Sequence, residues 1–236
     1  QFAVRKNKIF ILEVNPRASR TVPFVSKATG NQLAKIAAKA MIGIPLSEQD
    51  ETFSHTPGFY SVKGPVFPFN KFPDTDPILG PEMKSTGEVM GTGMSFGEAY
   101  IKSQYAAGTE IPLSGNVFIS VREPDKTKQL IKIAKQLLKK DYNLIATQGT
   151  CDFLLNNNVK CTFINKVREG KPHIVDMIKN KEINLIINTT EGKQSIQESF
   201  SIRAEAVIKN VTYYTSLEAA IATIDSFDYF NNIDIN

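Results

Sequence analysis

The sequence has little cysteine and no long apolar run, and both features narrow the class of protein. Its 236 residues include two cysteines, Cys151 and Cys161, which are too few for a disulfide framework. No apolar segment reaches the roughly 18 residues that a membrane-spanning helix needs, and the chain does not open with a secretory signal pattern. With 14 glycines, 12 prolines and a mean hydropathy of −0.19, collagen-like and disordered classes are excluded. We therefore expect a globular, cytoplasmic protein with no membrane partner.

A concentrated charge of one sign is also missing. Residues 1–113 carry 12 basic and 10 acidic side chains, and residues 114–236 carry 16 and 14. The net charge of +4 is thus spread thinly, whereas nucleic-acid-binding proteins concentrate their basic residues. We expect no nucleic-acid partner. The first residue is Gln1 rather than Met, inside a strand-like run, so we expect a piece of a longer protein.

Residues 1–113 predict an irregular region. Two strand-like runs flank a polar turn at residues 6–8, which is typical of a hairpin, and a loop follows Pro16. Seven of the prolines lie between residues 44 and 81, and they exclude long helices and central strands there. The expected elements are strands at Phe2–Arg5, Ile9–Val14 and Tyr60–Lys63 and helices at Leu33–Ile42 and Phe96–Tyr105.

Residues 114–236 alternate between strands and helices, after a domain boundary expected within Gly108–Gly115. Five such alternations in about 120 residues predict a parallel five-stranded sheet with helices on both faces, a Rossmann-like α/β domain. The strands are apolar on both sides, as buried parallel strands are. The expected strands are Val117–Val121, Leu144–Ala146, Thr162–Ile164, Ile183–Ile187 and Val211–Tyr214, and the helices are Lys126–Lys140, Asp152–Leu155, Ile174–Lys179, Ile202–Ile208 and Leu217–Ile224.

The run from Glu13 to Arg17 is the first candidate site. Glu13 and Asn15 alternate along an expected strand, so their side chains share one face. Carboxylate and amide oxygens are hard ligands that suit Mg²⁺ together with phosphate oxygens and water, and Arg17 could add a cation for the same phosphates. The run is also typical of a strand end followed by an Asn-Pro turn, and its spacing leaves both interpretations open.

Polar residues also follow the expected strands of the second part. Residues 147–150, Thr-Gln-Gly-Thr, lie between a strand and a helix, where backbone N–H groups and hydroxyls suit an anion. Residues 188–190 end another strand, and ligands of open parallel sheets bind beyond such ends. Routine helix capping and solvated lysines are the alternative. The candidate phosphate-binding residues are Lys126, Thr147, Thr150, Lys166, Asn188 and Thr190.

Longer blocks resemble a known family. The chain resembles the second ATP-grasp half of the carbamoyl phosphate synthetase large subunit in Leu12–Arg17, Thr21–Gly30, Pro68–Phe72, Leu79–Met83 and Ser85–Gly91. Its later residues resemble that subunit's methylglyoxal-synthase-like regulatory domain. The resemblance covers essentially the full length and implies a carboxy-terminal piece of the subunit. Residues 1–113 would be the end of the ATP-grasp domain, and residues 114–236 the allosteric domain.

The resemblance implies roles for individual residues. Gln1, Glu13 and Asn15 would hold Mg²⁺ or Mn²⁺ where ATP phosphorylates carbamate, and Arg17 and Arg20 would contact the nucleotide phosphates. The remainder of the ATP site is not in these residues, so we expect the piece alone to be inactive.

The resemblance also implies ligands and partners. The six candidate phosphate-binding residues would bind UMP, an inhibitor, or IMP, an activator, although Gln148 replaces a histidine that is common in relatives. The whole enzyme would make carbamoyl phosphate from bicarbonate, ATP and ammonia for pyrimidine and arginine biosynthesis. A small glutaminase subunit would supply the ammonia from glutamine, and the remainder of the large subunit would be the other partner.

Three other functions are weighed against this one. Ornithine activation is expected to be weak or absent, because Tyr213 and Thr215 fit such a site but Gly64 and Tyr214 stand where carboxylates are expected. A stand-alone regulatory module that binds a phosphorylated metabolite stays open. Methylglyoxal synthase activity needs an aspartate base, and Lys166–Pro172 contains none.

Overall fold

The computed structural model describes residues 1–49, 57–72, 75–80, 83–85 and 87–232. The chain forms two compact units, Gln1–Phe59 and Tyr60–Asn236, and each is described by itself. The family-like blocks around residues 81, 82 and 86 lie partly outside the described residues. Among the helices that are described, none is long and apolar enough to cross a membrane.

The first unit begins with the expected hairpin. Strands β1 (Phe2–Arg5) and β2 (Lys8–Ile11) pair antiparallel, so β2 is shorter than predicted. The two-residue turn has positive φ angles at Lys6 (48°) and Asn7 (61°), the left-handed geometry that matches the twist of a tight hairpin. The chain then leaves the sheet before Glu13, so the candidate metal ligands lie beyond the strand.

Two helices follow, one of them unexpected. Helix α1 (Thr21–Thr29) forms where the sequence predicted a loop. Its Pro23 lies in the first turn, where the missing N–H costs no helical hydrogen bond, and Gly30 ends it with φ 76° and an N–H bond to the Ser26 carbonyl. Helix α2 (Leu33–Met41) confirms the second prediction, and a short 3₁₀ turn, η1 (Leu46–Glu48), comes after it.

The second unit opens with an antiparallel pair and a helix. Strand β3 (Tyr60–Val66) is longer than predicted, and it pairs with β4 (Gly87–Gly93), which the sequence did not reveal. Helix α3 (Phe96–Ala106) packs on this pair. A methyl group on Gly91 would lie 2.0 Å from the Ala99 carbonyl oxygen of α3, so glycine is required for this close approach.

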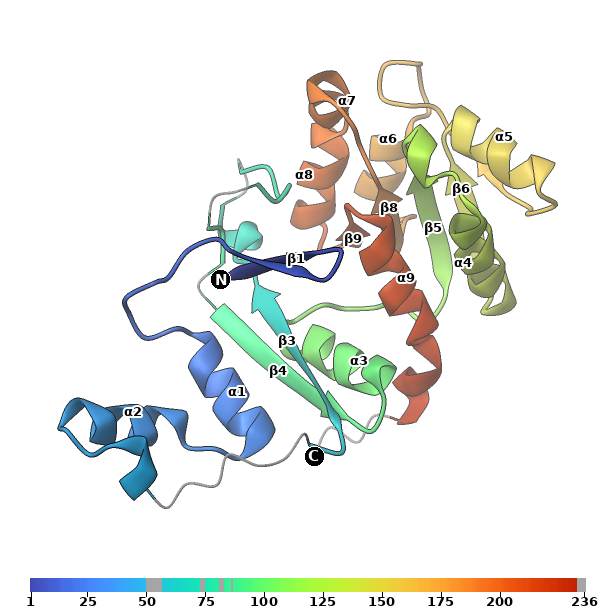
Figure 1. Ribbon diagram of the computed structural model, residues 1–236. Helices are drawn as coiled ribbons and strands as arrows, with labels where there is room; N and C mark the ends of the chain where they lie inside the picture. The colour runs from blue at the N-terminus through green and yellow to red at the C-terminus, as the bar shows by residue number, and fades with distance from the viewer. Residues whose placement is uncertain (50–56, 73–74, 81–82, 86, 233–236) are drawn as a thin grey trace. The chain divides into compact units, whose positions relative to one another are not determined.

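A five-stranded, fully parallel sheet forms the rest of the second unit, as predicted (Figure 1). Its strand order is β7-β6-β5-β8-β9, so the chain runs outward from the central strand first to one side and then to the other. The strands are β5 (Gly115–Ser120), β6 (Tyr142–Ala146), β7 (Thr162–Phe163), β8 (Leu185–Asn188) and β9 (Thr212–Tyr214).

Helices cover both faces of this sheet. Alternating residues of β5 enter different cores: Val117 and Ile119 join the core with α4, α5 and α9, whereas Phe118 joins the core with α6 and α8. A further short helix, α7, was not predicted. The helices are α4 (Lys128–Lys139), α5 (Gln148–Asn156), α6 (Ile174–Lys179), α7 (Lys193–Glu198), α8 (Phe200–Ile208) and α9 (Leu217–Asp225), with 3₁₀ turns at Phe69–Lys71, Glu123–Asp125 and Phe227–Asn232.

The expected domain boundary at Gly108–Gly115 lies inside the second compact unit. Ile101 of α3 shares one core with Leu217 of α9, and the Tyr100 and Thr223 hydroxyls lie 3.2 Å apart. The antiparallel pair and the parallel sheet are therefore packed together. Their division into two domains at residue 113 stays a prediction.

Candidate phosphate-binding and metal-binding sites

The first candidate site lies at the carboxyl end of the central strand. Strand β5 pairs with β6 on one side and with β8 on the other, and the connections leave in opposite directions. Open α/β sheets bind their ligands at this topological switch point. Four of the six candidate phosphate-binding residues come from the loops or helices that follow β5, β6 and β8, and a fifth, Asn188, ends β8. The four are Lys126, Thr147, Thr150 and Thr190.

Ser120, the last residue of β5, joins these loops. Its hydroxyl lies 3.0 Å from the Thr147 hydroxyl, and its carbonyl accepts hydrogen bonds from Asn188 Nδ2 (3.3 Å) and from the backbone N–H of Thr189 (3.0 Å). Sequence reasoning missed Ser120 because it ends an apolar run. Its signal was available: a small hydroxyl residue as the last residue of a buried strand.

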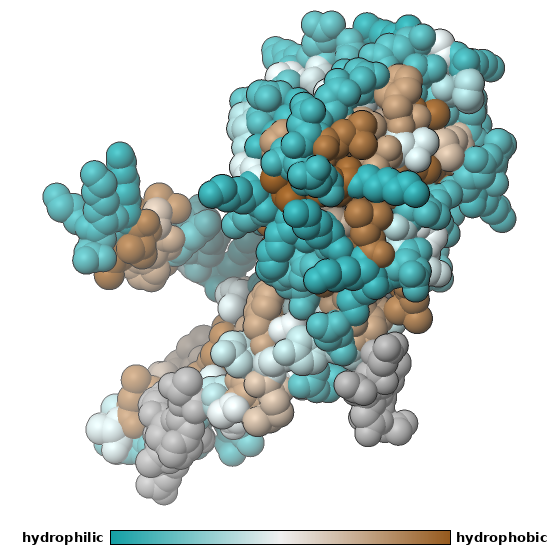
Figure 2. All heavy atoms as spheres, turned by 90° about the vertical axis from the view of Figure 1, so that its right-hand side faces the viewer, coloured by the Kyte–Doolittle hydropathy of each residue, from teal (hydrophilic) through white to brown (hydrophobic). Residues whose placement is uncertain are grey.

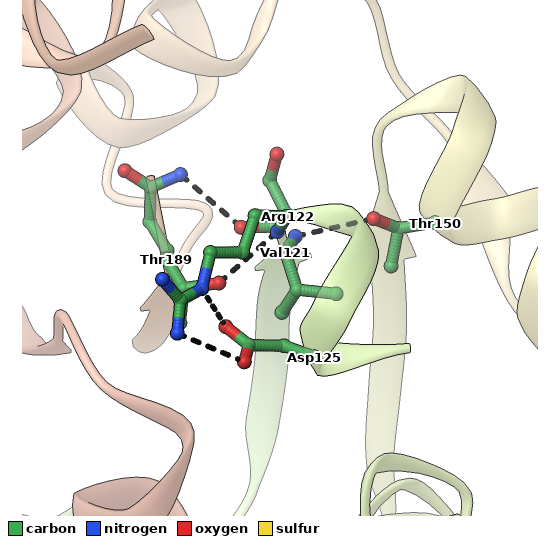
Figure 3. Close-up of polar contacts among 7 residues, drawn as sticks. Val121, Arg122, Asp125, Thr150 and Thr189 are labelled. Atoms are coloured by element: carbon green, nitrogen blue, oxygen red, sulfur yellow. Dashed lines mark hydrogen bonds and ion pairs between the residues drawn. The ribbon is translucent and has the colours of Figure 1, made fainter. Parts of the chain in front are cut away.

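Two threonine hydroxyls hold the loop after β5 (Figure 3). Thr150 Oγ1 accepts from the Val121 N–H at 3.2 Å, and Thr189 Oγ1 accepts from the Arg122 N–H at 3.1 Å. Each hydroxyl keeps its own proton for a second partner. Thr150, a predicted site residue, is buried, so its position serves the loop as well as any ligand.

The amino terminus of α5 lies next to a lysine. Gln148 and Gly149 occupy the first turn of α5, where backbone N–H groups have no acceptor within the helix. A methyl group on Gly149 would lie 3.3 Å from Lys126 Nζ, so the ammonium group and these N–H groups are adjacent. Lys126 is mostly buried and donates to Glu123 Oε2 at 2.6 Å, whereas the Glu123 side chain is 82% exposed. A bound anion would compete with that exposed carboxylate for the ammonium group.

Arg122 and Asp125 form an ion pair at the same strand end, with Arg122 Nε 2.9 Å from Asp125 Oδ2 (Figure 3). Burial acts to raise the pKa of Asp125, but the guanidinium group and the Thr189 hydroxyl outweigh it, and the net pKa is lowered. Asp125 in turn raises the pKa of Arg122. The pair therefore stays charged at neutral pH. Neither residue was predicted from the sequence to be part of a site.

The other three predicted phosphate-binding residues differ in how exposed they are. Asn188 is buried, and its Oδ1 atom has no hydrogen-bond partner in the described part of the chain. Thr190 is partly exposed. Lys166 is exposed on the loop after β7. Hydrophilic residues, drawn in teal, cover much of the face shown in Figure 2.

The second candidate site lies at the open end of the β1–β2 hairpin. The Gln1 amino group donates to the Glu13 carbonyl at 2.8 Å, and Asn15 Nδ2 donates to Glu13 Oε1 at 2.9 Å. The carboxylate and the amide are therefore neighbours, as expected, although they lie beyond the strand. All three residues are exposed. Such hard oxygen donors fit Mg²⁺ or Mn²⁺ whose other positions are filled by phosphate and water.

Two arginines follow this acid–amide pair. The Arg17 N–H donates to the Asn15 carbonyl at 2.8 Å, and Arg20 immediately precedes α1; both residues are exposed. Among the described residues, there is no group of three or more His, Cys, Asp or Glu side chains that could hold a metal ion. A metal ion bound here would therefore need amide oxygens and atoms from outside the first unit as its further ligands.

Comparisons with known proteins match the early and the later residues of the chain to different family models. Residues 1–49 match the family described as carbamoyl-phosphate synthase L chain, ATP binding domain, and residues 129–215 match the MGS-like domain. The carbamoyl phosphate synthase large chain of Xanthomonas campestris is 53% identical over 234 residues, which is 97% of this chain and 22% of that protein. The large chain of Haemophilus ducreyi is 54% identical over 100% of this chain and 22% of its own length.

The fold and the matches define the class: an MGS-like α/β domain joined to part of an ATP-binding domain. More particularly, the chain belongs to the carbamoyl phosphate synthase large-chain family, which confirms the resemblance. It spans about a fifth of the length of the curated relatives that it matches.

Proposed function

We propose that this chain is the carboxy-terminal part of a glutamine-hydrolysing carbamoyl phosphate synthase large subunit, an ATP-dependent ligase. Its first residues would complete the ATP site at which carbamate is phosphorylated, and its MGS-like domain would bind a mononucleotide effector. The remainder of the large subunit and a small glutaminase subunit would be its partners. Support comes from identity above 50% with large chains along nearly the whole sequence.

The hairpin residues would act on the ATP phosphates. Gln1, Glu13 and Asn15 would hold Mg²⁺ or Mn²⁺, which supplies charge neutralisation of the transferred phosphoryl group. Arg17 and Arg20 would contact the phosphates. Phosphoryl transfer depends on positioning by many groups at once, and these residues supply one side of the site. We expect no turnover from this chain by itself.

The single observation that carries the regulatory role is the contact between Lys126 and the first turn of α5. An ammonium group beside unpaired helical N–H groups attracts a phosphate dianion by charge and by hydrogen bonds. Thr147, Thr150, Asn188 and Thr190 would complete the site with polar groups from two strand ends, and Lys166 would add charge from a third loop. UMP and IMP are the effectors that the family resemblance implies.

The test is a calorimetric titration of UMP and of IMP into the 236-residue chain. Lys126→Gln removes the ammonium group at α5 and should weaken binding about tenfold or more, because charge-assisted hydrogen bonds to phosphate contribute about 1.5–3 kcal/mol. Lys139→Gln, at the other end of α4, is the matched control and should bind as the wild type does. Absence of binding, or equal loss in both variants, would contradict the regulatory role.

A second experiment separates the enzyme part from a stand-alone regulatory module. The chain is joined to the preceding residues of a large subunit, and carbamoyl phosphate synthesis is measured with Glu13→Gln. Loss of synthesis with unchanged effector binding supports the enzyme. Full carbamoyl phosphate synthesis by the Glu13→Gln variant would favour the stand-alone regulatory module.

Ornithine is not expected to regulate this chain. A side chain at Gly64 would begin 3.2 Å from Val89 Cγ2, in a buried position, so the expected carboxylate has little room there. Tyr214 is also buried. We expect ornithine to leave the melting temperature unchanged, and a saturable shift would contradict this.

A further inference from the structure

The two cysteines of the chain lie against each other. Cys151 is in the first turn of α5, and Cys161 immediately precedes β7. Both are free thiols, and the Cys161 S–H donates to Cys151 Sγ across only 3.0 Å. A disulfide bond is about 2.05 Å long, so the sulfur atoms need to approach by about 1 Å to be joined.

The two sulfur atoms differ in their exposure to solvent. Cys151 is 2% exposed and belongs to the core with Leu154 and Val159, whereas Cys161 is partly exposed at the edge of that core. An oxidant from solvent can therefore reach Cys161 first. Cys151 then lies directly behind it as the second thiol.

A metal site is the competing interpretation of a close cysteine pair. Structural zinc sites use four ligands from cysteine and histidine side chains. The part of the chain that the structure describes has no group of three His, Cys, Asp or Glu side chains that could hold a metal. The geometry of two isolated thiols thus fits oxidation better than coordination.

We propose that Cys151 and Cys161 form an oxidisable pair that a hydroperoxide converts to an intramolecular disulfide directly behind the anion-binding end of α5. The Cys161 thiolate attacks one peroxide oxygen; an S–O bond forms, the O–O bond breaks, and hydroxide leaves to become water. The Cys151 sulfur, having lost its proton, attacks the sulfenic sulfur, the S–O bond breaks, and a second water leaves. Two thiols are oxidised and one peroxide is reduced.

Burial, followed by the hydrogen bond to Cys151, raises the pKa of the Cys161 thiol well above its ordinary value. Because the thiolate is the reactive form, oxidation should be slow at neutral pH and faster as the pH rises. The pair is thus protected against brief exposure. Once formed, the bond would tie residues next to Gly149 and Thr150 to the start of β7.

The experiment treats the full 236-residue chain with hydrogen peroxide at mildly alkaline pH and then blocks remaining thiols with an alkylating agent. We expect mass spectrometry to show a monomer that has lost two hydrogens and carries no alkyl group. The disulfide should raise the melting temperature by about 5 °C, since it closes a loop of about ten residues, and dithiothreitol should reverse the shift. Cys151→Ser and Cys161→Ser are the controls and should show neither change.

A second measurement tests whether the fold itself favours the bond. The chain is equilibrated with glutathione buffers, folded and in urea, and the disulfide fraction is measured at each ratio. We expect the folded chain to be oxidised at a ratio at least about tenfold more reducing than the unfolded chain. Equal ratios, a product linked between chains, or two thiols that alkylate fully after peroxide treatment would each overturn the proposal.

Discussion

The two units of the chain differ in how much of their own apolar surface they cover. In the described part of the first unit, Ile36 is the sole hydrophobic side chain that is buried, whereas the hairpin residues Phe2, Val4, Ile9 and Ile11 are 67–72% exposed. In the second unit, helices bury both faces of the sheet. The comparison predicts that the first unit needs further contacts to fold stably, and that the second unit folds by itself.

The strongest test of this comparison is to separate the units. We expect residues 60–236 alone to unfold cooperatively, because both cores lie within them. Residues 1–59 alone should show no cooperative transition, since they bury too little apolar surface to offset chain entropy. Circular dichroism during heating measures both. A cooperative transition from residues 1–59 would contradict the comparison.

An ion pair with a buried arginine offers the next largest effect. Arg203 of α8 is 2% exposed, and its Nε and Nη2 atoms donate to the two carboxylate oxygens of Asp76 at 2.8 and 2.6 Å. Arg203→Met should lower the free energy of unfolding of the second unit by about 3 kcal/mol. Arg168→Met removes an exposed pair with Glu198 and serves as the control, with a loss below about 1 kcal/mol. Urea unfolding measures both, and equal losses would contradict the prediction.

Gly91 tests the packing of α3 on β4. Gly91→Ala places a methyl group 2.0 Å from the Ala99 carbonyl oxygen, and the helix has to move away. We expect a loss of about 2–3 kcal/mol in the free energy of unfolding. Gly58→Ala is the matched control, because no atom lies within 4 Å of its added methyl group. A loss of similar size in both variants would contradict the packing argument.

The Asp76 carboxylate predicts a pH dependence. Burial acts to raise its pKa, but the Arg203 and Ile78 hydrogen bonds and nearby positive charges outweigh burial and lower the pKa. A lowered folded-state pKa stabilises the fold above the unfolded value of about 3.9. This contribution is lost as the pH falls below about 4 toward the folded-state pKa. Asp76→Asn should remove that part of the acid sensitivity in urea unfolding between pH 5 and pH 2, and an unchanged slope would refute the assignment.

The smallest expected effect concerns a helix cap. His173 precedes α6, its Nδ1 accepts from the Asp176 N–H, and Asp176 Oδ2 accepts from the His173 N–H. His173→Ala should cost about 1 kcal/mol, whereas His173→Asn should keep most of the stability because asparagine is a good cap. Urea titration measures the free energy of unfolding of both variants. Loss of function without loss of stability would instead point to a chemical role.

Much of the parallel sheet could be predicted because its signals are local. Apolar runs and helical periodicity identified all five strands and five of the six helices around them. The polar residues at the strand ends indicated a candidate site at the carboxyl ends of the strands. The helix predicted at Ile174–Lys179 is confirmed, and His173 forms a capping box at its start. The roles of the predicted site residues stay predictions.

The parts that could not be predicted depend on distant contacts. Strand β4 contains three glycines, which weaken a strand pattern, and Gly91 is explained only by the approach of α3. Helix α1 carries Pro23 and several β-branched residues, so its composition resembles a loop. Ser120, Arg122 and Asp125 are ordinary in sequence, and their importance follows from strand order, which no short motif encodes.

The position of Ser120 has a consequence for how this domain can vary among its relatives. One residue at the end of the central strand bonds to Thr147, to Asn188 and to the backbone at Thr189. The bonds to Asn188 and Thr189 use the Ser120 backbone carbonyl, whereas the contact with Thr147 joins two hydroxyl groups, so an apolar substitution at either 120 or 147 leaves the other hydroxyl without this partner. We expect positions 120 and 147 to change together during evolution, so that this end of the sheet varies in coupled steps rather than one residue at a time.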